Sequence, residues 1–244
     1  MNMMRFTAMK TKLRKYPSIC LILMITIFSC LFTGCVNQHP KDSKKSSQNE
    51  SVETMLEITD QKEKQAVLNA KAKVKAMSGE PRIVATSPAV ADICDKLDLD
   101  LVGVPKSSTS KIPSRYKNVK KVGLAMSPDM EIVSSLNPDW ILAPSSLETD
   151  LKPKFEELKN TEYAFLNLRS VQGMYRSIQE LGEIFGKQQE AERVTKEFTT
   201  FYKNYTKRNK NKKHPKVLVL MGLPGSYVIA TENSYVGSLV KLAG

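Results

Sequence analysis

The chain has 244 residues and a formal net charge of +12, from 37 Lys and Arg against 25 Asp and Glu. Three of its four cysteines (Cys20, Cys30 and Cys35) fall within the first 35 residues, and the single one beyond them, Cys94, cannot make a cysteine-rich metal site. The length suits one large domain or two small ones. The basic excess is uneven, because residues 1–34 hold five basic residues and no acid.

Residues 1–34 have the composition of an export signal. The basic residues come first, an apolar run follows at 19–32, and Gly34 stands immediately before Cys35. The apolar run is too short to be a stable membrane-spanning helix. The pattern resembles a bacterial lipoprotein signal, which implies cleavage before Cys35, a lipid on the Cys35 thiol and anchoring to the cell membrane. A plain secretory signal would need no cysteine at this place.

Residues 35–80 are predicted to be a tether and spacer. Residues 36–50 are polar and have no periodicity, which is typical of a linker. Residues 52–77 have modest helical periodicity and many charges. We therefore predict a solvated helix or an extended spacer there, outside the core.

Residues 81–170 alternate between short apolar runs and segments with helical periodicity. This alternation predicts an α/β lobe, with a parallel sheet covered by helices on both faces. Cys94 lies at helical spacing from apolar neighbours, so we expect a buried thiol. The predicted strands are 82–86, 99–104, 139–143 and 162–166, and the predicted helices are 89–97, 130–136 and 151–159.

Residues 171–213 are predicted to form a connecting backbone helix. Apolar side chains keep a helical period for about ten turns, and Gly186 allows a kink. Residues 214–244 then show a strand at 216–221, a turn, a strand at 227–231 and a helix at 235–243. These elements are too few to bury a core of their own. We therefore expect an incomplete C-terminal lobe, in a fragment or a truncated protein.

A run of basic residues crosses the end of this helix. Residues 203–216 carry no acid, and we interpret them as a solvated helix end and linker with some attraction to an anionic membrane surface. Nucleic-acid binding would need such a run on an intracellular protein, interleaved with aromatics, and the export signal argues against it. The basic residues are Lys203, Lys207, Arg208, Lys210, Lys212, Lys213 and Lys216.

The stretch from Lys121 to Pro138 reads as the end of a strand, a loop and the start of a helix. Ser127 and Pro128 suit the N-cap and the first turn of that helix. Met126 stands immediately before them, on an uncharged loop where its thioether can point away from the core. A methionine more often fills an irregular gap inside a core. The residues alone leave both interpretations of Met126 open.

The order of the segments is similar to that of substrate-binding lipoproteins of iron-compound ABC importers. Several stretches from Arg82 to Gly244 more specifically resemble the haem-binding lipoproteins (IsdE type) of the Gram-positive iron-regulated surface determinant system. The resemblance implies a bilobed class III substrate-binding fold, present here without most of its second lobe. It is carried by RIVATS (82–87), DKLDLDLVG (95–103), IPSRYK (112–117), VGLAMSPDME (122–131), SIQELG (177–182), HPKVLVLMGLPGSY (214–227) and ATENSYVGSLVKLAG (230–244).

The resemblance implies that haem b is the transported ligand, held between two lobes with one Met and one His on its iron. The Met of the VGxxMxPxxE segment corresponds to Met126, and the matching His would lie beyond Gly244. The family can carry a Tyr where this chain has Ser108, so an aromatic contact is missing. The other haem-contacting positions correspond to Pro88, Ala89, Ser107 and Ser108.

The chemistry of haem agrees with these residue types. A flat apolar ring with two carboxylates needs an apolar slot, axial donors and polar groups at one edge, and a thioether paired with an imidazole holds the iron six-coordinate. We expect backbone N–H groups at the helix starts near Pro88 and Ser127 to receive the propionates. Lys106 and Lys111 are nearby in sequence and are expected to be solvated.

Other donors in the chain are weaker candidates. His39 falls in the tether and His214 in the basic linker, so neither is predicted to be a ligand. Tyr227 and Tyr235 carry phenol oxygens, but we expect both to be packed aromatics with solvated hydroxyls.

The resemblance also implies the partners and excludes catalysis. The partners would be ABC permease and ATPase subunits and cell-surface haem-relay proteins, at the extracellular face of a Gram-positive membrane. The chain has no G-x-S-x-G or H-E-x-x-H motif, so we do not expect an enzyme. The alternative is a siderophore- or cobalamin-binding lipoprotein of the same fold. With one axial ligand outside the chain, residues 35–244 are expected to bind haem weakly, in a five-coordinate or exposed form.

Overall fold

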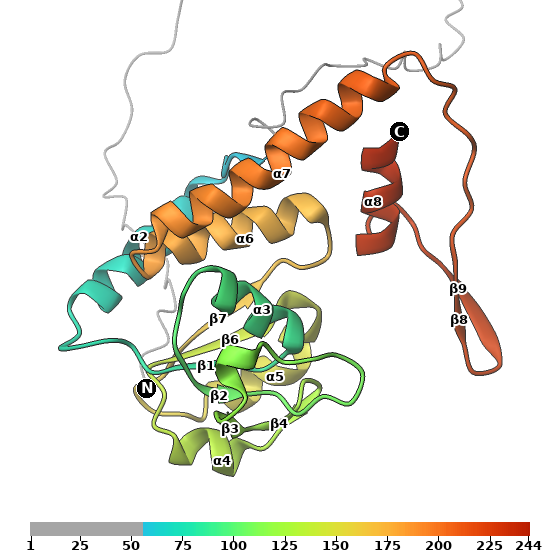
Figure 1. Ribbon diagram of the computed structural model, residues 1–244. Helices are drawn as coiled ribbons and strands as arrows, with labels where there is room; N and C mark the ends of the chain where they lie inside the picture. The colour runs from blue at the N-terminus through green and yellow to red at the C-terminus, as the bar shows by residue number, and fades with distance from the viewer. Residues whose placement is uncertain (1–55) are drawn as a thin grey trace, which may run out of the picture. The chain divides into compact units, whose positions relative to one another are not determined.

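The computed structural model describes residues 56–244 (Figure 1). The predicted signal, Cys35 and residues 36–55 of the tether and spacer lie outside the described residues. Among the described helices, none is both long and apolar enough to cross a membrane. The elements are α2 (Gln61–Lys75), β1 (Ile83–Ala85), α3 (Pro88–Lys96), β2 (Leu101–Val104), η1 (Ser114–Tyr116), β3 (Lys120–Lys121), β4 (Gly123–Leu124), β5 (Ser127–Pro128), α4 (Met130–Ser135), β6 (Trp140–Pro144), η2 (Ser145–Leu147), α5 (Glu148–Phe155), β7 (Glu162–Leu166), α6 (Val171–Ile184), α7 (Gln188–Asn209), β8 (Leu220–Leu223), β9 (Ser226–Ile229) and α8 (Tyr235–Ala243).

A five-stranded sheet lies at the centre of the lobe, in the order β3-β2-β1-β6-β7. Every neighbouring pair in it is parallel. Parallel neighbours need crossover connections, and α3, α4 and α5 each lie between two consecutive strands of the sheet. The predicted α/β class is confirmed.

The two faces of the sheet support separate cores. Along β1, Ile83 and Ala85 belong to one hydrophobic cluster and Val84 to the other, as the twofold alternation of strand side chains requires. Helices α3 and α6 supply side chains to the first cluster, and α4 and α5 supply the second. Burial on both faces explains why the strands are almost continuously apolar.

Helix α3 begins with a conventional cap and buries the lone thiol of the lobe. The Ser87 hydroxyl accepts a hydrogen bond from the Val90 N–H at 3.3 Å, and Pro88 occupies the first helical position. Cys94 is fully buried in the first cluster, and burial raises the pKa of its thiol to about 12. The prediction of a buried Cys94 thiol is confirmed.

The prediction of one kinked helix over residues 171–213 is wrong. Gly186 adopts a φ of 71°, a left-handed conformation that ends α6 rather than bending it. The end of α6 then meets the start of α7 at Gly182 and Ala191. The start of α6 meets the middle of α7, where the rings of Tyr175 and Phe198 stack with centroids 4.3 Å apart. The two helices are therefore antiparallel, and α7, with 22 residues, is the long helix.

Residues 52–77 were predicted to lie outside the core. This prediction is also wrong for the described residues of that range. Helix α2 packs on the lobe through a narrow stripe of side chains at spacings of three and four, which is one face of a helix. Ion pairs join Lys71 to Glu183 and Lys73 to Glu162. The many charges on the other faces of α2 concealed the stripe, which consists of Val67, Ala70, Val74 and Met77.

The last described elements form a hairpin and a helix, as predicted, although the first strand begins at Leu220 instead of residue 216. The Val171 N–H donates to the Ser238 hydroxyl of α8 at 3.2 Å, and the Tyr205 hydroxyl donates to the Ala243 carbonyl at 3.0 Å. Several large side chains of the hairpin are exposed: Leu220, Met221, Tyr227, Val228 and Ile229.

Gly182 has no side chain, which allows α6 and α7 to approach each other closely. A Cβ added there would lie 2.6 Å from the Ala191 Cβ and 3.0 Å from the Lys187 carbonyl oxygen. We expect Gly182→Ala to lower the free energy of unfolding by about 1–3 kcal/mol, although alanine favours helix formation. Urea unfolding of Gly182→Ala/Ala191→Gly, which has the same composition as the parent, should recover at least half of that loss. A swap no more stable than the single variant would contradict this packing.

The packing of α2 on α6 also makes stability depend on pH. Burial, with a further contribution from the adjacent Glu63 carboxyl, raises the pKa of Glu180 from 4.5 to about 8, against the lowering effect of Arg176. The folded state thus holds a proton that the unfolded state releases above about pH 4.5, so stability should fall as pH rises from about 4.5 to about 8.

Thermal unfolding at pH 5 and pH 8 tests this dependence. Glu180→Gln cannot ionise, so we expect its melting temperature at pH 8 to exceed that of the parent by about 2–4 °C and to change less between the two pH values. Glu192→Gln, which alters an exposed carboxylate on α7, is the matched control and should keep the dependence of the parent. An unchanged pH dependence in Glu180→Gln would disprove the assignment.

Candidate functional site

Met126 lies at the tip of a small hairpin. Strands β4 and β5 pair antiparallel, which leaves Ala125 and Met126 as the two residues of the turn. The Met126 side chain is 73% exposed, and Leu124 beside it is also exposed. The core-filling interpretation of Met126 is therefore excluded, and its thioether is available to a ligand.

The base of this hairpin is fixed by backbone hydrogen bonds. The Lys106 N–H donates to the Gly123 carbonyl at 2.6 Å, and the Asp129 N–H donates to the Val122 carbonyl at 2.7 Å. Gly123 has a φ of 95°, and a Cβ there would lie 2.9 Å from the Asp129 nitrogen. Val122 is fully buried and ties the hairpin to the second core. A short turn on such a base holds Met126 in a defined position.

The helix start predicted at Ser127 is wrong. Ser127 and Pro128 form β5, and the N-cap of the six-residue helix α4 is Asp129, whose carboxylate accepts from the Ile132 N–H at 3.0 Å. Asp is as good an N-cap as Ser. The pairing of Ser127 with Leu124 across the turn decides between them. This result removes Ser127 from the predicted propionate donors.

The other predicted contact residues lie at the same edge of the sheet. Pro88 and Ala89 follow β1, and Ser107 and Ser108 follow β2, its parallel neighbour. Because parallel strands end at one edge, these residues share the carboxyl edge, where ligands of open α/β sheets bind. The bond from Lys106 to Gly123 joins the loop after β2 directly to the Met126 hairpin.

Some of the predicted contact residues at this edge offer polar donors. In the first turn of α3, Pro88 has no N–H, and the N–H groups of Val90 and Ala91 donate to Ser87. The Ala89 N–H is the donor that remains in that turn. The Ser107 oxygen accepts from the Ser110 N–H at 3.0 Å, which leaves its own hydroxyl hydrogen for another partner, and Ser108 is exposed.

Metal-binding alternatives receive no support from the part of the chain that the structure describes. No group of three or more His, Cys, Asp and Glu side chains that could hold a metal ion occurs there. The Nδ1 atom of His214 lies 2.8 Å from the Gly244 carbonyl oxygen, within hydrogen-bond distance. Tyr227 is 77% exposed on the β8–β9 hairpin, so the prediction of a packed ring is wrong there. His39 lies outside the described residues.

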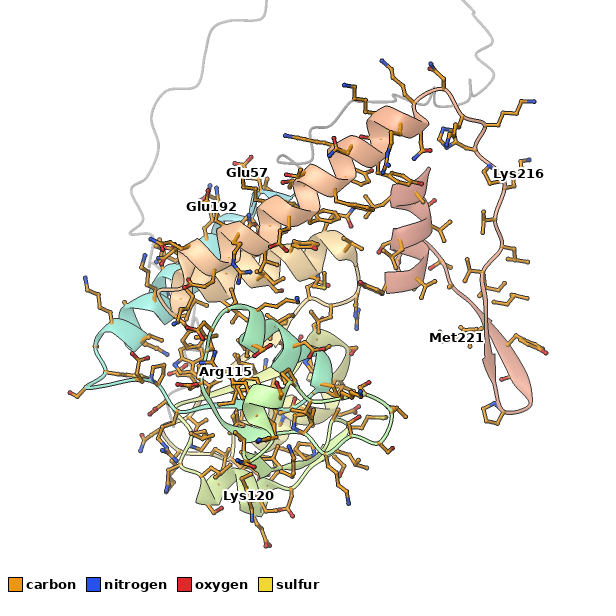
Figure 2. All side chains as sticks on the ribbon, viewed as in Figure 1. Glu57, Arg115, Lys120, Glu192, Lys216 and Met221 are labelled. Atoms are coloured by element: carbon orange, nitrogen blue, oxygen red, sulfur yellow. The ribbon has the colours of Figure 1, made fainter. Side chains whose placement is uncertain are left out.

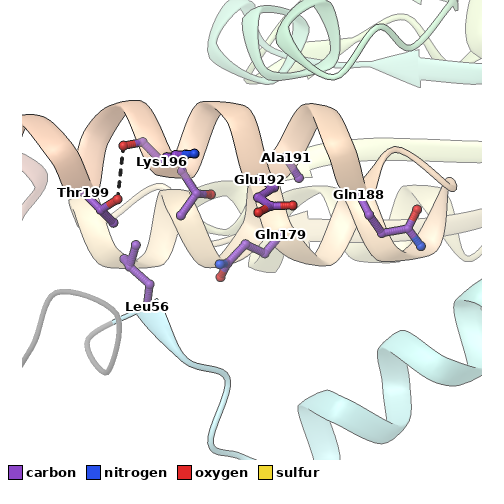
Figure 3. A pocket seen from close by; sticks show the side chains of 8 residues that line it. Leu56, Gln179, Gln188, Ala191, Glu192, Lys196 and Thr199 are labelled. Carbon is purple, nitrogen blue, oxygen red and sulfur yellow. Dashed lines mark hydrogen bonds between the residues drawn. The ribbon is translucent and has the colours of Figure 1, made fainter.

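The clearest cavities lie elsewhere, along α2, α6 and α7. One of about 470 Å³ is lined by Leu56 together with side chains of α6 and α7 (Figure 3). Another, of about 420 Å³, lies among α2, α6 and the strands β6 and β7. None of the predicted contact residues lines either cavity. The candidate site therefore lies apart from these two cavities, at the carboxyl edge of the sheet.

Solved structures share this architecture. An ABC transporter substrate-binding protein from Listeria monocytogenes EGD-e is 46% identical and superposes with a TM-score of 0.64, over 68% of this chain and 64% of that one. The complex of Staphylococcus aureus IsdE with heme is 40% identical, with a TM-score of 0.63 and the same coverage. A siderophore-binding protein, BauB, shares only the fold, at 21% identity and a TM-score of 0.56.

Sequence comparison agrees. The high-affinity heme uptake system protein IsdE of Staphylococcus aureus (strain Newman) is 42% identical over 168 residues, which are 68% of this chain and 57% of that protein. The aligned chain thus spans less than two thirds of the relative's length. The family model described as periplasmic binding protein matches residues 83–244. Together with the parallel sheet and its helices, these matches show that the chain belongs to the periplasmic binding protein family.

Proposed function

We propose that this chain is part of the haem-binding component of an ABC-type importer, without enzymatic activity of its own. The observation that carries the proposal is the exposed Met126 thioether at the carboxyl edge of the sheet, on a hairpin with a fixed base. The 42% identity to a heme uptake protein supports haem as the ligand class.

The edge residues offer apolar contacts for the haem ring and polar donors for its propionates. A soft thioether suits haem iron as an axial ligand, and we assign Met126 that role. Pro88, Ala89 and the exposed Leu124 offer apolar contact for the ring. The Ala89 N–H and the hydroxyls of Ser107 and Ser108 are donors for propionate oxygens.

The remaining ligand and the partners follow from the resemblance. We propose haem b as the cargo, and a His outside residues 35–244 as the second axial ligand. We also propose lipid anchoring through Cys35 at the extracellular face, delivery to a permease with its ATPase, and loading by cell-surface relay proteins.

A siderophore or cobalamin is the alternative cargo. Such ligands favour aromatic and arginine side chains and need no thioether donor. The predicted contact positions at the described edge are Pro, Ala, Ser and Met, with no aromatic or Arg among them. The edge therefore favours haem over the alternative.

Haem titration followed by absorption tests the role of Met126. We expect residues 35–244 to bind haem weakly and to shift its Soret band, and Met126→Ala to reduce the affinity by about tenfold or more, because an iron–thioether bond is lost. Met221→Ala is the matched control, since Met221 is also an exposed methionine on a two-stranded hairpin (Figure 2). It should bind haem as the parent does.

Three results would contradict the assignment. Equal losses in Met126→Ala and Met221→Ala would show that the effect is unspecific. Unchanged affinity in Met126→Ala would remove the thioether from the iron. Binding of a ferric siderophore without binding of haem would favour the alternative cargo.

A further inference from the structure

The C-terminal end of α7 and the linker after it carry a cluster of positive charge that the proposed haem site does not use. We call it the basic end of α7. All seven of its basic side chains are exposed, and the segment contains no acid. Figure 2 shows Lys216 on the extended linker beyond the helix. The cluster consists of Lys203, Lys207, Arg208, Lys210, Lys212, Lys213 and Lys216.

Helix stability explains only part of this cluster. Lys207 and Arg208 lie in the last turn of α7, where cations interact favourably with the helix dipole. Lys210 is the C-cap of the helix, and Lys212, Lys213 and Lys216 follow it, beyond the range of the effect. Like charges at this density repel one another, and an anionic partner would reduce that repulsion.

The chain enters the described lobe beside the same helix. Leu56, the first described residue, is 2% exposed and lines one cavity with Thr195, Lys196 and Thr199 of α7. Figure 3 shows the Leu56 side chain directed toward α7 near Thr199. The described lobe therefore begins at the flank of α7.

The distances allow both attachments at once. At about 1.5 Å of rise per residue, Lys210 lies roughly 16 Å along the helix from Thr199. The chain between Cys35 and Leu56 can extend no further than about 70 Å. A lipid on Cys35 thus keeps the basic end of α7 within reach of the bilayer that holds the lipid.

We propose that the basic end of α7 docks on the anionic surface of the bilayer to which the chain is anchored. The lobe would then have two attachments to one membrane, a lipid at Cys35 and an electrostatic contact at the end of α7. Clusters of four to eight Lys and Arg near a bilayer bind acidic headgroups in this way. The inference rests on the proposed lipid anchor for its choice of a membrane over other polyanions.

Vesicle sedimentation tests the contact without the anchor. The protein is the chain from residue 35 with Cys35→Ala, which keeps every described element and cannot be acylated. The probes are vesicles of phosphatidylcholine alone and vesicles with about one third phosphatidylglycerol. We expect partition into the phosphatidylglycerol vesicles to be at least tenfold stronger and to disappear at high salt, because exposed charges are screened.

Two quadruple variants make the test specific. Lys207→Gln/Lys210→Gln/Lys212→Gln/Lys213→Gln should lose at least tenfold of the partition into phosphatidylglycerol vesicles. The matched control removes the same charge from exposed lysines elsewhere and should lose less than threefold. It carries Lys117→Gln/Lys121→Gln/Lys152→Gln/Lys159→Gln.

Several outcomes would overturn the proposal. Equal losses of partition in the two variants would show that binding depends only on the net charge of the protein. Equal partition into neutral and anionic vesicles would exclude an electrostatic contact. Salt-sensitive binding to a DNA duplex, without binding to the anionic vesicles, would show that the cluster binds nucleic acid instead of a membrane. Since the test protein has no acyl group, a failure here is separate from a failure of lipid anchoring, which mass spectrometry of the exported chain detects at Cys35.

Discussion

The double burial of the central strands β1 and β6 is the constraint on which the rest of the structure depends. Val84 and Ile141 point to one core, and Ile83 and Leu142 to the other, and all four are buried. Both faces must then be covered by crossover helices, which makes the sheet parallel and brings the ends of its strands to one edge. The candidate haem contacts lie at that edge because the loops of a covered sheet are the surfaces left open to ligands.

The sequence predicted the sheet well and the helices around it less well. Strands buried on both faces leave a dense apolar signal, and the four longer strands were found where they occur. The break at Gly186 was missed because apolar periodicity is the same for one long helix and for two helices that pack on each other. The packing of helix α2 on the core was missed because its contact stripe is only Val67, Ala70, Val74 and Met77, while its charges indicate a solvated helix.

The candidate site depended on tertiary contacts that no local pattern contains. The residues alone did not decide whether Met126 fills the core or binds a ligand, and the resemblance favoured ligand binding. What fixes it in space is the hydrogen bond from Lys106 to Gly123, between loops after β2 and β3. The same bonding pattern moves the helix start from Ser127 to Asp129. Among the predicted contact residues, the Ala89 N–H and the serine hydroxyls remain as donors.

The central claim is that the Met126 thioether meets the haem iron. It is tested most directly by NMR of the chain with ¹³C-labelled methionine methyl groups, with the Met126 signal assigned from Met126→Leu. On addition of haem, we predict that the Met126 methyl signal moves far from its position in the free protein while the Met221 signal stays in place. A Met126 signal that does not move when haem is bound would contradict the account.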